Sequence, residues 1–127
     1  MKKFFKWTGS VFLALIIVMM IFAFLGKNET LDLNIQSIDL KQISDGTYMG
    51  NYENFRWSTQ VEVTVQDHKI TKIQQLKIQD GRNKLVEELR EKIIKQQSPD
   101  VDVYTGATAS SNSYLRAVEI ALENATK

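Results

Sequence analysis

The chain contains no cysteine among its 127 residues, and only one histidine and one proline. Without cysteine it forms no disulfide, no Cys-ligated zinc or iron–sulfur site, and no lipid attachment through an N-terminal cysteine. A single histidine cannot build a His-rich metal site, and we expect His68 to be a solvated turn residue. No acid–base pair with catalytic spacing is visible either. The sequence therefore predicts neither a metal centre nor catalytic residues.

An excess of charge of one sign is also lacking. The chain has 16 basic and 15 acidic residues, which gives a formal net charge of +1. This balance offers no support for nucleic-acid binding or for steering toward an acidic partner. The length leaves room for one small domain and an appendage.

The N-terminal part is a long apolar run. No charged residue lies between Trp7 and Gly26, and Val11 to Leu25 is continuously apolar. An uncharged stretch of about 20 residues is long enough to cross a bilayer as one helix. The flanking charges are uneven, with Lys2, Lys3 and Lys6 on one side and Lys27 on the other. The positive-inside rule therefore predicts a cytoplasmic N-terminus and an extracytoplasmic remainder.

We accordingly expect residues 1–27 to be a cytoplasmic stub and a single-pass transmembrane anchor in the cell membrane, with the lipid bilayer as a partner. A cleavable signal peptide is the alternative, but the run is long for one and no small-x-small cleavage site follows it. Residues 28–43 are predicted to be a tether. Within them, Leu31, Leu33 and Ile35 alternate with polar residues, as in an extended edge segment.

Residues 44–127 carry the signals of a folded domain. Strands are expected at 46–52, 60–66 and 69–79, because Val61, Val63 and Val65 alternate with polar residues and Asp67-His68 is typical of a tight hairpin turn. The apolar residues of the third strand are not spaced strictly by two, which indicates a bulge or a change of face.

Two amphipathic helices complete this domain. One is expected over 82–97, before Ser98-Pro99, and the other from about Ser110 to Thr126. The predicted class is α+β: a small antiparallel sheet packed with two helices and preceded by a transmembrane helix.

The most informative segment, Asp102-Val-Tyr-Thr-Gly-Ala-Thr108, comes directly before the last predicted helix. A helix start carries unpaired N–H groups and the positive end of the helix dipole, so it attracts phosphate. Gly106 allows the backbone to approach a ligand closely. Thr108 is then placed to hydrogen-bond a phosphate or to be esterified by one. The alternative interpretation of this segment is an ordinary turn with a Ser or Thr N-cap. We expect Ser110, Ser111 and Asn112 to be N-caps rather than ligands.

This segment resembles the flavinylation motif of FMN-binding domains, Asp-x-x-Ser/Thr-Gly-Ala-Thr/Ser. The matching positions are Asp102, Thr105, Gly106, Ala107 and Thr108. The resemblance extends from about Ser44 to Ala125 and includes Asp45-Gly46-Thr47-Tyr48-Met49-Gly50, which is similar to the opening strand of the family. In that family a flavin transferase takes FMN from FAD and joins its phosphate to the last Thr or Ser of the motif.

The resemblance implies FMN bound covalently through a phosphoester at Thr108. The N–H groups of Gly106 and Ala107 are the expected phosphate donors, and Thr105 either caps the turn or bonds the phosphate. Asp102 serves recognition by the transferase, the geometry of the turn, or both. Among the aromatic residues, Tyr104 is the best choice for a wall of the flavin site because it lies beside the motif.

A threonine hydroxyl is a weak nucleophile without a base, and no His or Lys lies near Thr108 in the sequence. We therefore expect an external flavin transferase to be the modifying partner. The resemblance further implies an electron-transfer flavoprotein, rather than a substrate-transforming enzyme, that receives electrons from a membrane reductase. Two alternatives remain open at this point: a membrane-tethered interaction module without flavin, and a reductase that binds FMN noncovalently.

Overall fold

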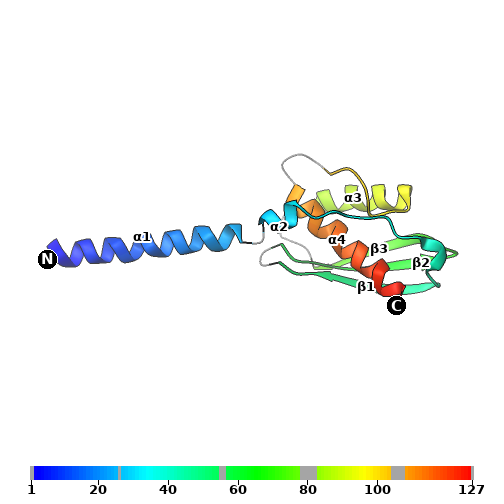
Figure 1. The fold of residues 1–127 in the computed structure, drawn as a ribbon, viewed down its shortest axis with the longest axis horizontal. Helices are drawn as coiled ribbons and strands as arrows, with labels where there is room; N and C mark the ends of the chain where they lie inside the picture. The colour runs from blue at the N-terminus through cyan, green and yellow to red at the C-terminus, as the bar shows by residue number, and fades with distance from the viewer. Residues whose placement is uncertain (1, 26, 55–56, 78–82, 104–107, 127) are drawn as a thin grey trace.

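The computed structural model describes residues 2–25, 27–54, 57–77, 83–103 and 108–126 (Figure 1). Its folded part is a three-stranded antiparallel sheet in the order β1-β2-β3, with helices packed on it. This confirms the predicted α+β class. The elements are α1 (Lys2–Phe24), α2 (Lys27–Leu31), the 3₁₀ turn η1 (Leu40–Gln42), β1 (Gly46–Tyr52), β2 (Thr59–Gln66), β3 (Lys69–Lys77), α3 (Asn83–Gln96) and α4 (Thr108–Ala125).

Helix α1 extends away from the rest of the protein (Figure 1) and buries none of its 23 residues. At 1.5 Å per residue it is about 35 Å long, compared with about 30 Å for the hydrocarbon core of a bilayer. Helix α1, near the N-terminus, is therefore long and apolar enough to span a membrane. Exposure of so many apolar side chains is compatible with a lipid environment.

The sheet is amphipathic because its central strand alternates. Val61, Val63 and Val65 are fully buried, whereas the residues between them are half-buried and face away from the helices. The β2–β3 connection is a two-residue turn in which Asp67 and His68 have φ values of 52° and 61°. Positive φ at both positions is the signature of the tight hairpin turns that match strand twist, so the predicted hairpin is confirmed.

Strand β3 contains the predicted irregularity. The β2–β3 register shifts between Thr64 and Val65, which pair with Lys72 and Ile70 and leave one extra residue on β3. Because of this bulge, Ile70 and Ile73 both point into the core although they are three residues apart, with exposed fractions of 1% and 2%. The predicted continuation of this strand through 78–79 lies outside the described residues.

The contact between α4 and β1 depends on Gly50. A Cβ atom built at Gly50 would lie 1.8 Å from the backbone oxygen of Ala117 and 2.7 Å from the nitrogen of Ala121. The backbone of the helix therefore rests directly on the strand, and no side chain fits between them. This contact fixes how α4, and with it Thr108 at its start, lies across the sheet.

Helix α3 packs beside α4 through buried Val86, Leu89 and Ile93. It ends at a left-handed residue, Gln97, with φ of 57°, and the N–H of Ser98 donates to the Ile93 carbonyl. The six-residue span of that bond is the Schellman arrangement that closes many helices.

The side chain of Gln97 also extends the edge of the sheet. Its Oε1 accepts from the Ile70 N–H at 2.6 Å, and its Nε2 donates to the Ile70 carbonyl at 3.0 Å and the Ile94 carbonyl at 2.6 Å. One amide side chain thus satisfies both backbone groups of a residue on the edge strand β3 and ties the end of α3 to the sheet.

The segment between α1 and β1 lies on the domain. Leu31 ends the short helix α2 instead of beginning an extended edge segment, and the chain from Leu33 to Asp39 has no regular secondary structure. Ile35 and Ile38 pack against the core, and Ile43 is fully buried in it. His68, on the exposed hairpin turn, places its Nδ1 3.1 Å from the Leu40 carbonyl of η1.

Candidate functional site

The motif hydroxyl lies at the first residue of α4. The helix begins at Thr108, two residues earlier than the sequence predicted, so the last residue of the motif is the first residue of the helix. The first N–H groups of a helix have no intrahelical acceptor, and the dipole is positive there. Thr108 therefore lies at the end of α4 that attracts an anion.

Thr108 is also the accessible hydroxyl of this turn. It is half-exposed, whereas the next seven residues of the helix are all buried. Among them, Ser110 is 8% exposed, Ser111 is 0% and Ser113 is 4%. Among the described residues of this first turn, Thr108 therefore has the most exposed hydroxyl side chain.

The expected N-capping role of Ser110, Ser111 and Asn112 is wrong, because all three lie within α4. Asn112 instead serves α2, since its Nδ2 donates to the Thr30 carbonyl at 2.9 Å and the Leu31 carbonyl at 3.2 Å. The neighbouring Ser113 Oγ bonds the Thr59 Oγ1 of β2 at 2.8 Å. The polar residues at the start of α4 thus hold tertiary structure together.

Two buried hydroxyls near the start of α4 have no hydrogen-bond partner in the described part of the chain. They belong to Ser111 and Tyr114, whose side chains are 0% and 1% exposed and lie one turn apart on the helix. Burial raises the pKa of the Tyr114 phenol well above its usual range, and the nearby charge of Arg90 offsets part of that effect. An unpaired buried hydroxyl costs about 1–3 kcal/mol, so each of these two groups would gain from a partner that the described residues do not supply.

The remaining motif residues are placed only in part. Asp102 is exposed, and its carbonyl accepts a hydrogen bond from the Lys92 Nζ of α3 at 3.3 Å. This bond brings the chain before the motif against α3. The sequence-predicted residues Tyr104, Thr105, Gly106 and Ala107 lie outside the described residues.

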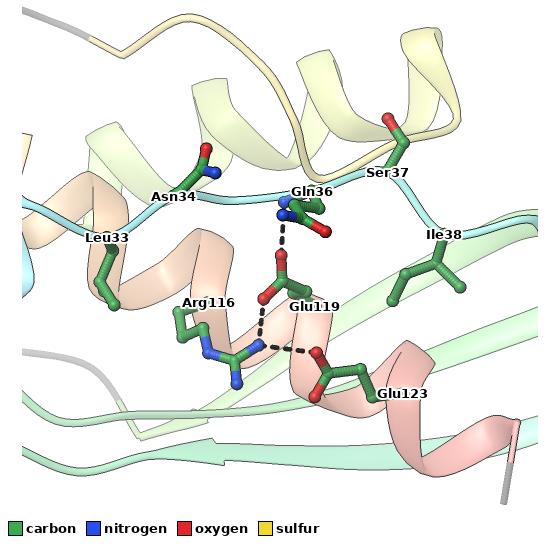
Figure 2. A pocket seen from close by; sticks show the side chains of 8 residues that line it. All are labelled: Leu33, Asn34, Gln36, Ser37, Ile38, Arg116, Glu119 and Glu123. Carbon is green, nitrogen blue, oxygen red and sulfur yellow. Dashed lines mark hydrogen bonds and ion pairs between the residues drawn. The ribbon is translucent and has the colours of Figure 1, made fainter.

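A concave feature that sequence reasoning missed lies farther along α4. A groove of about 330 Å³ runs between this helix and the segment 33–38 (Figure 2). At its centre Glu119, 5% exposed, accepts from the Gln36 N–H and pairs with Arg116, which also donates to Glu123 at 3.0 Å. The remaining lining residues are Leu33, Asn34, Ser37 and Ile38.

This groove is separate from the motif, since Arg116 lies more than two helical turns, about 12 Å, beyond Thr108 along α4. Its acids and base already satisfy one another and the backbone of Gln36, so the groove is a structural junction. The only signal in the sequence is Glu119 itself, a charged residue between the apolar positions Val118 and Leu122.

The comparison with known families matches the motif-bearing part of the chain. A family model described as the FMN-binding domain matches residues 56–123, more than half of the sequence. No curated protein matches the chain. The matched range contains β2, β3, α3, the motif and nearly all of α4, so FMN is the cofactor that the match supports. The chain belongs to the FMN-binding domain family.

Proposed function

We propose that this protein is a membrane-anchored flavoprotein that carries FMN as a phosphoester on Thr108 and relays electrons outside the cytoplasm. The observation that carries the proposal is the position of Thr108, an accessible hydroxyl at the first residue of α4 inside a complete flavinylation motif. FMN supplies one- and two-electron transfer when bound. The protein supplies position and the electrostatic surroundings.

The residues near the start of α4 suit such a group. The N–H groups of the first turn and the positive dipole of α4 would stabilise a phosphate at Thr108. Ser111 and Tyr114 offer two buried hydroxyls without partners among the described residues, which a ligand held at this end would satisfy. These hydroxyls would hold and orient the group.

Attachment requires an external enzyme. The only histidine, His68, lies at the β2–β3 turn, at the opposite end of the domain from the start of α4 (Figure 1). It therefore cannot act as the base for Thr108, and self-modification has no histidine to activate the hydroxyl. A flavin transferase is the partner we propose for this step.

An ester bond also suits the proposed location. The basic residues in the first turns of α1 favour a cytoplasmic N-terminus, which would export the domain. A cofactor that dissociates there is lost, whereas an ester keeps it attached. We therefore assign the role of electron carrier, supplied by a membrane reductase, rather than of an enzyme that transforms a substrate.

The test is coexpression with a flavin transferase. We expect the full chain to become yellow, to fluoresce after denaturing electrophoresis and to gain the mass of one FMN ester on the peptide containing Thr108. Thr108→Val should abolish all three signals, and Thr126→Val, at an exposed threonine beyond the other end of α4, should keep them. Release of intact FMN by acid would favour the noncovalent reductase, and a colourless wild-type protein would favour the interaction module.

The topology has its own test. The chain has no cysteine, so a single Thr126→Cys substitution creates one reactive thiol. We expect a membrane-impermeant maleimide added to intact cells to label it. Labelling only after the cells are opened would contradict the extracytoplasmic assignment.

A further inference from the structure

Helix α2 is fixed to the domain although it is too short to be stable alone. It has five residues, and isolated helices of that length do not persist in water. The last carbonyls of a helix have no intrahelical partner, and here Asn112 of α4 donates to two of them, those of Thr30 and Leu31. Asn112 is 6% exposed, so water competes little for these bonds.

The end of β1 provides a second attachment. The hydroxyl of Thr30, fully buried, bonds the Tyr52 hydroxyl at 2.8 Å, and Asn54 Nδ2 donates to Glu29 at 3.2 Å. Helix α2 is thus held by α4 on one side and by the end of β1 on the other. Its orientation relative to the domain is set by these contacts, of which the Asn112–Thr30 bond is buried and the Asn54–Glu29 bond is exposed.

This attachment limits how far Thr108 can lie from the membrane anchor. Leu25, the last apolar residue of the N-terminal run, precedes α2 by two residues, and Asn112 follows Thr108 by one helical turn. These links keep Thr108 within roughly 25 Å of Leu25. Figure 1 shows the start of α4 at the end of the domain from which α1 leaves, whereas the β2–β3 turn and the C-terminus lie toward the far end.

We propose that α2 and Asn112 form a strut that turns the start of α4 toward the bilayer. The headgroup layer on each side of a bilayer is only about 5–8 Å thick. A soluble protein would have to enter the narrow space between domain and lipid to reach Thr108. The second half of the proposal rests on the proposed function: the membrane reductase proposed above reaches the group on Thr108 at the bilayer surface, on the side of the domain that faces the lipid.

The orientation is tested without flavin. In the cysteine-free chain, Thr108→Cys and Thr126→Cys each give one site for a fluorophore, and the two sites are separated by about 27 Å along the axis of α4. The full chain is reconstituted into phosphatidylcholine vesicles that contain a headgroup-nitroxide lipid. We expect stronger quenching at position 108 than at 126. Equal quenching, or stronger quenching at 126, would overturn the strut.

The role of Asn112 is tested in the same vesicles. Asn112→Asp keeps the shape but has no N–H donor for the α2 carbonyls, so the quenching difference should be lost. The matched control is Asn124→Asp on the same helix, which removes a hydrogen bond to the Met49 carbonyl and leaves α2 untouched. A quenching difference that survived Asn112→Asp would contradict the assignment.

A second variant covers the case in which Asn112→Asp fails to fold. Ten Gly/Ser residues inserted after Leu25 leave every contact of the domain intact but add a flexible spacer of roughly 18 Å between anchor and strut. The quenching difference should again be lost. A retained difference would mean that the domain is oriented by something other than the strut.

The membrane partner is tested on flavinylated protein. In vesicles prepared from native membranes, reduction of the flavin is followed by bleaching of its visible absorption, and the spacer variant should be reduced severalfold more slowly because the effective concentration of the partner falls. Reduction by dithionite should be unchanged. If native membranes reduced the spacer variant as fast as the wild-type chain, the membrane partner would be refuted and the strut would not. If the wild-type chain carried no flavin, the proposed function would be refuted, and the quenching result on the orientation of the domain would still hold.

Discussion

The substitution Gly50→Ala tests the contact on which the placement of α4 depends. The added Cβ would lie 1.8 Å from the Ala117 oxygen, and Cβ atoms do not approach other atoms closer than 3.0 Å. Helix α4 would therefore have to move by at least about 1.2 Å, because the obstacle is backbone and no rotamer change relieves it. Such a shift separates fully buried Val118 and Leu122 from the sheet.

Overpacking a core with one methyl group typically costs 1–3 kcal/mol, and we expect about 3 kcal/mol here because rigid backbone stands in the way. For a domain of 60–100 residues this corresponds to a fall in melting temperature of roughly 12–24 °C. Gly50→Val should cost more. Asn51→Ala, at the exposed next position of β1, should change stability by less than about 0.5 kcal/mol.

The assay is urea unfolding of the full chain in detergent, followed by tryptophan emission. Trp57 is 7% exposed and reports on the domain, and Trp7→Phe removes the other tryptophan, in α1, from every sample. Loss of stability by less than about 1 kcal/mol in Gly50→Ala would refute the reasoning, since a Cβ could not then be blocked by the helix backbone.

Three further stability predictions use the same assay. Gln97→Ala should destabilise by about 2–3 kcal/mol, because it leaves both backbone groups of Ile70 without their partners; a neutral effect would contradict the role of this side chain at the sheet edge. Glu119→Ala should destabilise the domain by about 2–3 kcal/mol, because it removes the buried carboxylate that pairs with Arg116. Glu123→Ala should cost less than about 0.5 kcal/mol, because the Glu123 side chain is 46% exposed. Equal effects of the two substitutions would refute this distinction. Burial raises the pKa of Tyr114 in the folded state, so the folded protein holds the phenol proton more tightly than the unfolded chain does. The free energy of unfolding is therefore unaffected by the ionisation of this group at neutral pH and falls as the pH rises above about 10, where the unfolded phenol ionises. Tyr114→Phe should be neutral or stabilising near pH 7, because it removes a buried hydroxyl without a partner among the described residues. It should also reduce the loss of stability above about pH 10. An unchanged dependence of stability on alkaline pH would count against the burial of this hydroxyl.

Local patterns predicted much of the fold. The alternation of Val61, Val63 and Val65 placed one face of the sheet in the core, and Asp67-His68 located the hairpin turn, because both signals depend only on neighbours along the chain. The irregular spacing of Ile70 and Ile73 indicated a bulge, which the register confirms.

Prediction was weaker at the start of α4. The segment Thr-Ala-Ser-Ser-Asn contains several residues that favour N-caps, so the pattern alone could not select the helix start, and it was placed two residues late. Asn112 was expected to cap its own helix and instead caps α2, because Thr30 and Leu31 come within reach of its side chain only in the folded chain.

By itself the sequence determined the apolar N-terminal helix, the α+β class, and the motif that ends at Thr108, since each is a property of consecutive residues and their periodicity. Only the tertiary structure decided three other roles. The backbone of α4 packs directly on Gly50, the Gln97 side chain bonds the backbone of Ile70 on the edge strand β3, and Asn112 bonds the last carbonyls of α2. These roles arise between residues that are far apart in the chain, and the hydrogen bonds and close backbone contacts that define them exist only after the chain has packed.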